Sequence, residues 1–96
     1  MRETVSTTAA SHAAAPATVT VRFFAAAREA FGTKESTAEA ATLADLISVL
    51  TAGADAEAVT VLERSSFLVN ARARTDRQAP LAAGDTVDVL PPFAGG

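Results

Sequence analysis

The sequence predicts one small α+β domain in which helices pack on one face of a mixed β-sheet. At residues 19–25 and 86–90, an apolar residue stands at every second position. This period of two is typical of half-buried strands, with one face on the core and the other outward. Between these strands, at residues 43–50, four apolar residues recur with helical spacing. The chain has 96 residues, enough for a single domain with one compact core.

Residues 1–17 precede the first periodic pattern, and we expect them to form a disordered extension. They contain six alanines and five serines or threonines, a composition that cannot bury enough apolar surface to fold. The segment lacks the continuous apolar run of a signal peptide and has too few arginines for a transit peptide. No run of about 18 apolar residues occurs in the chain, so no membrane span is predicted and we expect a cytoplasmic protein.

The folded domain is expected to span residues 18–90 and to begin with a strand and a short helix. The alternation places Phe24 on the face of the sheet opposite the core. The residues predicted to face the core are Val19, Val21, Phe23 and Ala25. Residues 26–31 have a helix-forming composition and end at Gly32, a good helix stop. Glu35–Ala40 is predicted to be a second strand, although its alanines would suit a helix as well.

The middle of the sequence predicts two helices. Thr42 can cap the first helix, and the carboxylate of Asp45 in its first turn is favourable at the positive end of the helix dipole. Gly53 is a natural stop for this helix. Its apolar face consists of Leu43, Leu46, Ile47 and Leu50. A shorter helix is expected over residues 55–64, although two β-branched residues disfavour it. Its inward side chains are expected to be Ala58, Val61 and Leu62.

The last third of the sequence predicts two or three strands. Phe67–Val69 is the first of them, and residues 70–76 are expected to hold a turn and a short edge strand. Thr86–Leu90 is the final strand, with its two valines on the core side. Pro91 and Pro92 must end this strand, because neither residue has an N–H to donate to a neighbouring strand.

The composition excludes several classes of function. The formal net charge is −3 and no basic stripe is present, so nucleic acid is not an expected ligand. Arg72, Arg74 and Arg77 are expected to form a solvated turn or edge-strand face, and a contact patch for an acidic partner is the alternative. The chain has no cysteine, and its one histidine, His12, lies in the extension, so we expect no metal site and no bound cofactor. The carboxylates lie in caps, turns and helix faces, which leaves no set of side chains for catalysis.

The C-terminal tail, residues 91–96, is expected to be flexible and to carry the chemistry. Glycine has no Cβ, so Gly95 and Gly96 can enter a channel that other residues would block. The two prolines before them stiffen the exit from the last strand, which lowers the entropy lost when a partner captures the tail. Phe93 is a candidate anchor in a partner's groove, and the alternative is that it folds back onto its own domain. Ala94, which follows Phe93, is small enough to pass through a narrow tunnel in the partner.

The reactive group is predicted to be the carboxylate of Gly96. A carboxylate is a poor electrophile, and adenylation gives it a good leaving group. The acyl-adenylate can then be attacked by a sulfur donor, to give a thiocarboxylate, or by an amine, to give an amide. The chain offers no residues for either step, so we expect it to be the substrate of an ATP-using enzyme.

From Thr18 to Gly96 the chain resembles the MoaD/ThiS sulfur carriers, and most closely the MoaD branch, the small subunits of molybdopterin synthase. Three stretches carry the resemblance: Phe23–Gly32, Pro80-Leu81 together with Gly84–Val87, and Leu90–Gly96. The last of these is the most specific, because Pro-Pro precedes Gly-Gly. The resemblance implies the ubiquitin-like β-grasp fold.

The resemblance also implies a reaction cycle. A MoeB-like adenylating enzyme would activate Gly96 with ATP, and a sulfurtransferase would supply the sulfur. The thiocarboxylate would then enter a MoaE-like large subunit and donate sulfur to a cyclic pyranopterin precursor. Within the same class, a carrier for thiamine or cysteine synthesis is an alternative. A ubiquitin-like protein modifier and an interaction module with an inert Gly-Gly are alternatives from other classes.

Two further expectations concern the surface. The family usually has Gly where Ala71 stands here, and we expect Asn70 to adopt the left-handed conformation instead. If the first and last strands are neighbours, Phe24, Leu90 and Phe93 form an apolar patch that leads to the tail and suggests a docking site. The predicted partner-binding residues are Phe24, Leu90, Pro91, Pro92, Phe93, Ala94 and Gly95.

Overall fold

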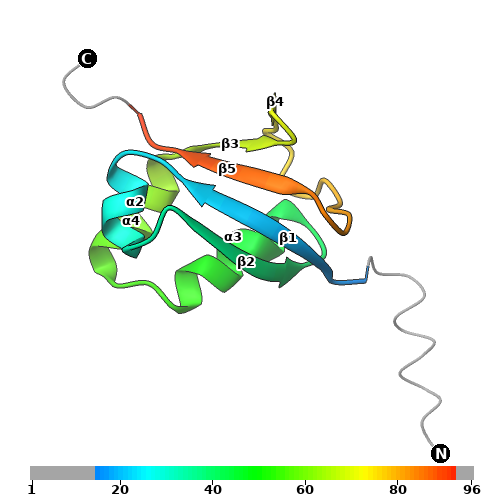
Figure 1. Ribbon diagram of the computed structural model, residues 1–96, viewed down its shortest axis with the longest axis horizontal. Coiled ribbons are helices and arrows are strands. Elements are labelled where there is room, and N and C mark those ends of the chain that lie inside the picture. Colours follow the sequence, from blue (N-terminus) through cyan, green and yellow to red (C-terminus); the bar gives the residue numbers. More distant parts are fainter. Residues whose placement is uncertain (1–14, 93–96) are drawn as a thin grey trace, which may run out of the picture.

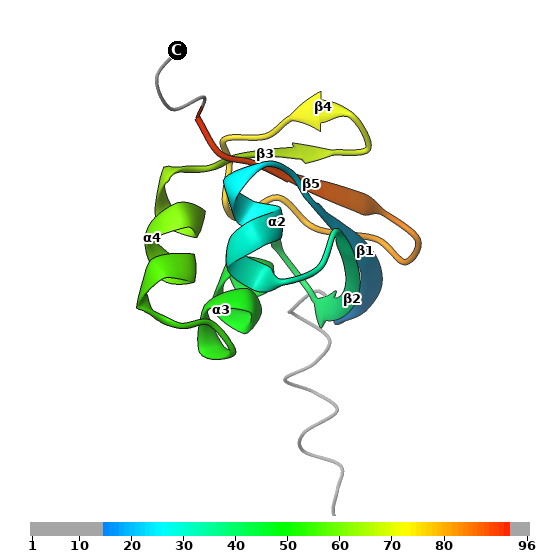
Figure 2. The same cartoon turned by 60° about the vertical axis from the view of Figure 1, so that its left-hand side comes forward.

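A computed structural model describes residues 15–92 of the chain (Figure 1). In this part, three helices cover one face of a five-stranded sheet, and the other face, called the open face below, carries no helix (Figure 2). The elements are β1 (Ala17–Phe23), α2 (Ala26–Phe31), β2 (Glu35–Ala40), α3 (Leu43–Ala52), α4 (Ala56–Arg64), β3 (Ser66–Val69), β4 (Arg72–Ala73) and β5 (Thr86–Leu90). The predicted α+β class and the mixed sheet with helices on one face are confirmed.

The strand order is β2-β1-β5-β3-β4, with a parallel pair at its centre. β1 and β5 run side by side in the same direction, so that Val21 pairs with Val87 and Phe23 with Val89. The two flanking strands, β2 and β3, are antiparallel to their neighbours. This is the β-grasp arrangement that the resemblance implies. Because β1 and β5 are parallel, their C-terminal ends lie side by side at the same end of the sheet.

The core lies between the sheet and the helices. Inward residues of the strands alternate with exposed ones, and Phe23 stacks on Phe31 of α2 with ring centroids 4.7 Å apart. Burying one such side chain contributes about 1.5–3 kcal/mol. The buried core cluster comprises Val19, Val21, Phe23, Ala27, Ala40, Leu43, Leu46, Leu62, Phe67, Val69, Leu81, Val87 and Val89.

Side chains at the helix starts explain where α3 and α4 begin. The Thr42 hydroxyl accepts a hydrogen bond from the Asp45 N–H at 3.1 Å, as predicted. Asp55 does the same for α4, because its Oδ1 accepts from the Ala58 N–H at 2.9 Å. Asp55 is therefore the cap, and the helix itself starts one residue later than predicted. No helix within residues 15–92 is long and apolar enough to cross a membrane.

The structure corrects the sequence prediction at three turns. Ala25 does not continue β1 on the core side: it is exposed, with φ of 51°, because the chain turns there to place α2 beneath the sheet. Gly53 follows α3 but has φ of −100°, so it ends the helix without a left-handed conformation. Asn70 has the expected left-handed conformation, and Ala71 shares it, with φ of 52° and 71°. A two-residue hairpin turn of this type requires positive φ at both positions.

Candidate functional site

The candidate site is the end of the sheet at which the central strand β5 stops and the chain leaves the domain (Figure 1). We call Leu90, Pro91 and Pro92 the tail root. Pro91 is half-buried and Pro92 is exposed. The remaining predicted tail residues, Phe93, Ala94, Gly95 and Gly96, lie outside the described residues, as does His12 in the extension.

The tail root borders two helices across a small pocket. Pro91 and Pro92 line a pocket of about 160 Å³ together with Ala26 of α2 and with Val61 and Arg64 of α4. Proline has a fixed φ and no N–H, so the strand cannot continue, and the chain leaves the sheet in a restricted direction. The ends of α2 and α4 therefore determine where the tail starts.

Phe24 and Leu90 lie at neighbouring strand ends, as the sequence predicts. The Phe24 N–H donates to the carbonyl of Val89 at 3.3 Å, which places Phe24 beside the last residues of β5. Both Phe24 and Leu90 are half-buried. Their position makes an apolar surface available beside the tail root, while its use by a partner stays a prediction.

An ion pair on the open face lies next to this apolar surface. Arg22 Nε is 3.2 Å from Asp88 Oδ1, and the guanidinium also lies over the Phe24 ring, 5.1 Å from its centroid. The Asp88 side chain is 14% exposed and that of Arg22 is 48% exposed. Asp88 Oδ1 is buried and makes no well-directed hydrogen bond to any described group, although the Arg22 guanidinium lies within ion-pair distance. The pair fixes Arg22 above Phe24.

Sequence reasoning missed the Arg22–Asp88 pair. The alternation in each strand does place both residues on the open face. Their meeting depends on the register of β1 against β5, in which Arg22 pairs with Asp88. The pair could have been predicted only by combining two signals. These are the alternation within each strand and the adjacency of the first and last strands, which the resemblance implies.

The opposite end of β5 is fixed by a polar cluster. Asp85 accepts hydrogen bonds from the Ala82 N–H at 2.8 Å and from the Asn70 side-chain amide at 2.9 Å. The Asn70 side-chain oxygen in turn accepts from the Thr86 N–H at 3.0 Å. These bonds, first that from Ala82 and then that from Asn70, hold the pKa of the Asp85 carboxyl below its usual value. The cluster joins the β3–β4 hairpin to the start of β5 and so sets the register of the strand that carries the tail.

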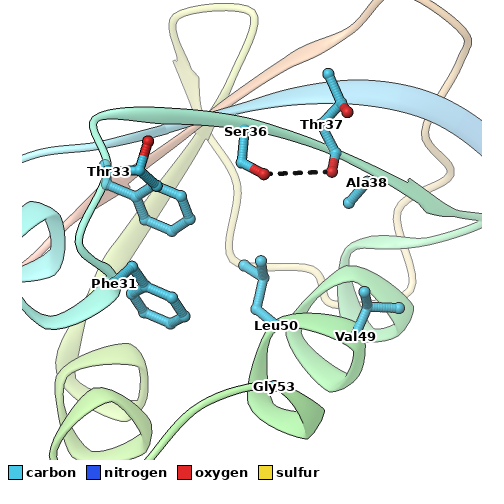
Figure 3. A pocket seen from close by; sticks show the side chains of 9 residues that line it. Phe31, Thr33, Ser36, Thr37, Ala38, Val49, Leu50 and Gly53 are labelled. Atoms are coloured by element: carbon cyan, nitrogen blue, oxygen red, sulfur yellow. Dashed lines mark hydrogen bonds between the residues drawn. The ribbon is translucent and has the colours of Figure 1, made fainter.

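A larger pocket lies away from the tail, between β2 and α3. It has a volume of about 280 Å³, and Figure 3 shows Phe31 and Leu50 beside it, with Val49 at its rim. The hydroxyl of Ser36 donates to the backbone carbonyl of Thr37 at 3.5 Å (Figure 3). No carboxylate or imidazole lines this pocket, so it offers no acid–base pair. Within residues 15–92, no three side chains are grouped as metal ligands.

Comparisons with known proteins cover both the domain and the tail. The sequence profile of the ThiS family matches residues 21–96. The structure resembles the HVO 2177 protein of Haloferax volcanii, with a TM-score of 0.70 and 33% identity over 85% of this chain and 89% of that one. It also resembles the small archaeal modifier protein 1 of Methanosarcina acetivorans, with a TM-score of 0.74 and 26% identity over 84% and 98% of the two chains.

A third similar structure is a two-subunit assembly. It is the complex of subunits 1 and 2 of the molybdopterin-converting factor from Helicobacter pylori, in which a matching chain has a TM-score of 0.66. The identity is 25%, over 82% of this chain and 99% of that one. No curated protein sequence matches the chain.

Proposed function

This chain belongs to the ThiS family, and on that premise we propose that it is a sulfur carrier for molybdopterin synthesis. The matching profile covers residues 21–96, which include nearly the whole domain and the full tail. The chain has the ubiquitin-like β-grasp fold of its family. In the proposal, Gly96 is adenylated, converted to a thiocarboxylate and used to donate sulfur to a cyclic pyranopterin precursor.

The observation that carries the proposal is the exit of the tail from the central strand β5. Strand neighbours on both sides fix this strand, and the tail root then leaves the sheet between the ends of α2 and α4. Six residues, 91–96, follow the strand, and extended they reach about 20 Å. That length allows the end of the chain to enter a partner's active site while the domain stays outside.

The proposed chemistry uses only the terminal carboxylate of this chain. An oxygen of the Gly96 carboxylate attacks the α-phosphate of ATP, and pyrophosphate leaves. A hydrosulfide anion, supplied through the sulfurtransferase, then attacks the carbonyl carbon of the acyl-adenylate and expels AMP, which leaves a thiocarboxylate on Gly96. The chain contains no cysteine, so it has no thiol of its own that could supply the sulfur.

The partners in the proposal supply the catalytic groups. A MoeB-like adenylating enzyme binds and uses the ATP, a sulfurtransferase provides the sulfur, and a MoaE-like large subunit receives the loaded tail. The two-subunit molybdopterin-converting factor of Helicobacter pylori supports the last of these. In this arrangement Phe24 and Leu90 contact the partner, while Phe93, Ala94 and Gly95 enter it.

A protein modifier is the second candidate function. It is favoured by the similarity to the small archaeal modifier protein 1 of Methanosarcina acetivorans. The same acyl-adenylate would then be attacked by a lysine amine, with formation of an isopeptide bond. Carriers for thiamine or cysteine synthesis would share the thiocarboxylate and differ only in the acceptor of the sulfur.

The absence of cysteine makes a direct test possible. The protein is purified from cells with an intact pathway and treated with a thiol-alkylating probe, and intact-protein mass spectrometry locates the label. We expect one label, on Gly96, and none after deletion of Gly95 and Gly96. Complete absence of a labelled C-terminus would contradict the carrier function.

The same cells separate the candidates. A modifier would be found joined to lysines of other proteins, and chains of the protein on itself would run through Lys34, its only lysine. If deletion of Gly96 leaves molybdenum-enzyme activity intact, the molybdopterin assignment is wrong.

A further inference from the structure

We propose that a pocket at the outer edge of β3 binds carboxylate side chains of the protein that adenylates the tail. The pocket, called the edge pocket below, has a volume of about 210 Å³. Its polar lining consists of Ser65, Ser66, Arg74, Thr75 and Arg77. The inference rests on the proposed function for the identity of the partner, and on the pocket itself for the chemistry.

The edge pocket exists because β4 is too short to cover β3. Only Leu68 and Val69 of β3 pair with β4. The Arg74 N–H still donates to the carbonyl of Phe67 at 3.0 Å, and after Arg74 the chain leaves the sheet. The outer edge of β3 at Ser66 therefore has no strand beside it, and the residues that follow Arg74 form the far wall of the pocket.

Both arginines are anchored near the pocket. The guanidinium of Arg77 lies over the ring of the buried Phe67, 5.2 Å from its centroid. The backbone carbonyl of Arg77 accepts a hydrogen bond from the Ala44 N–H at 2.7 Å, which ties this residue to α3. The backbone of Arg74 is bonded to β3, and its side chain is exposed. Because the Arg77 guanidinium already lies on a ring, less conformational freedom is lost when this group binds an anion.

The chemistry of the lining favours a carboxylate ligand. None of the residues that line the pocket carries a carboxylate, and within residues 15–92 no ion pair involves Arg74 or Arg77. A guanidinium offers paired N–H donors that match the two oxygens of a carboxylate. Ser66 and Thr75 also line the pocket, and their hydroxyls can act as further donors.

One acidic residue of the domain is influenced by Arg74 without occupying the pocket. The positive charge of Arg74 also lowers the pKa of Asp85. The oxygens of Asp85 are bonded to the Ala82 N–H and the Asn70 amide, and Asp85 does not line the pocket. The edge pocket therefore has two guanidinium groups and no carboxylate in its lining, on a chain whose formal net charge is −3.

The position of the edge pocket identifies the partner. Ser66 pairs with Leu90, the last residue of β5, so the pocket borders the tail root across a single strand. Figure 2 shows β3 between β5 and β4. A protein that holds the tail root lies within reach of both guanidinium groups. Complementary charge beside a binding site speeds the association of two proteins and sets their relative orientation.

A titration tests the chemistry of the pocket directly. The ¹⁵N-labelled chain is titrated with a hexaglutamate peptide and, in parallel, with sodium phosphate and a short single-stranded RNA. We expect hexaglutamate to shift the amide signals of residues 65–67 and 73–77. Binding should weaken at least tenfold in the Arg74→Glu/Arg77→Glu variant and recover in Arg74→Lys/Arg77→Lys.

Arg72 provides the matched control. It lies in the same hairpin, is exposed and does not line the pocket, so Arg72→Glu should leave hexaglutamate binding within twofold of the original. Equal losses in Arg72→Glu and in the double variant would overturn the inference, as would tighter binding of phosphate or RNA than of the peptide. Deletion of residues 93–96 must leave the same amide signals unmoved, because a shift would mean that the chain's own carboxylate occupies the pocket.

A measurement in cells separates this inference from the proposed function. The fraction of protein with a thiocarboxylate at Gly96 is compared for the original chain, Arg72→Glu and Arg74→Glu/Arg77→Glu. We expect at least a tenfold lower fraction in the double variant alone. If the original chain carries no thiocarboxylate, the proposed function fails. If the double variant is loaded as well as Arg72→Glu, the inference fails and the proposed function stands. Arg74→Glu alone keeps the Arg77–Phe67 contact and controls for a loss of folding.

Discussion

The two ends of β5 are held by different kinds of interaction. At its start, Asn70, Asp85 and Thr86 form a cluster of directional hydrogen bonds to neighbouring loops. At its end, Leu90 and Pro91 are half-buried apolar residues, and the two prolines share a pocket with α2 and α4. Hydrogen bonds with defined partners fix a register, whereas apolar packing tolerates exchange of one neighbour for another. The start of the strand therefore sets its position, and the end presents the tail to a partner.

Removing the end of the tail is expected to have the largest effect on function and none on stability. Deletion of Gly95 and Gly96 should abolish the thiocarboxylate, because the new terminal carboxylate, on Ala94, lies two residues short of the position that Gly96 takes in the proposed partner. The melting temperature should not change. Intact-protein mass spectrometry and thermal unfolding monitored by circular dichroism measure the two quantities. A drop in melting temperature would contradict this prediction, because it would show that the end of the tail also stabilises the folded domain.

Disrupting the start of β5 should have the opposite effect. Asn70→Ala removes the side-chain bonds to Asp85 and Thr86, and we expect a loss of about 1–2 kcal/mol in the free energy of unfolding. The loading of Gly96 should stay unchanged at temperatures where the domain is folded. Urea unfolding measures the loss. Gln78→Ala, which changes another exposed amide outside the cluster, is the control and should change stability by less than about 0.5 kcal/mol.

Changing the apolar surface at the end of β5 should affect partner binding far more than folding. Leu90→Ala is expected to weaken binding to the partner that takes the tail about tenfold, or about 1.4 kcal/mol. The free energy of unfolding should fall by less than about 0.5 kcal/mol, because Leu90 is only half-buried. Isothermal titration calorimetry gives the affinity. Val89→Ala is the contrasting variant. Because the Val89 side chain is buried, its truncation should lower the free energy of unfolding.

The hairpin beside the cluster offers a stabilising change. Ala71 has a left-handed conformation, which costs a residue with a Cβ about 1–2 kcal/mol. Ala71→Gly removes this strain and adds freedom to the unfolded chain, so we expect a net gain of about 0.5–1 kcal/mol. Urea unfolding measures it. Ala73→Gly, in the strand after the turn, should destabilise the domain, and a gain there would contradict the explanation.

The smallest expected effect is a dependence of stability on pH through Asp85. Its pKa is lower in the folded than in the unfolded protein, so its hydrogen bonds contribute fully above the unfolded-state pKa. This contribution is lost as the pH falls through the folded-state pKa. Between about pH 5 and about pH 2, the free energy of unfolding should therefore decrease more for the original chain than for Asp85→Asn. Parallel decreases in the two proteins would mean that other carboxylates dominate.

The sequence predicts the elements of the fold well, because each depends on a local pattern. The alternation in β1 and β5, the stripe on α3 and the caps at Thr42 and Asp55 all lie within a few residues of the structure that they determine. Ala25 was misassigned, because its position in an alternating pattern gives no sign that the chain must turn there. Neither alanine at positive φ, at 25 or 71, carries a propensity for that conformation.

Contacts between distant segments could not be predicted from local pattern alone. The Arg22–Asp88 pair depends on the parallel register of β1 and β5. The edge pocket depends on the short length of β4, which leaves part of β3 uncovered. The neighbouring positions of Phe24 and Leu90 were expected only because the family resemblance implied which strands are adjacent. The predicted tail residues Phe93–Gly96 stay predictions, since they lie outside the described residues.

The central position of β5 has a mechanical consequence. A partner that draws the tail into a tunnel applies force to Leu90 along the axis of the strand. β1 and β3 are hydrogen-bonded to β5 on either side, so this force acts in shear on two ladders at once. In shear many bonds share the load and must yield together, whereas a strand peeled from the edge of a sheet loses them one by one. If the tail is inserted and withdrawn as proposed, the domain is therefore expected not to unravel from that end.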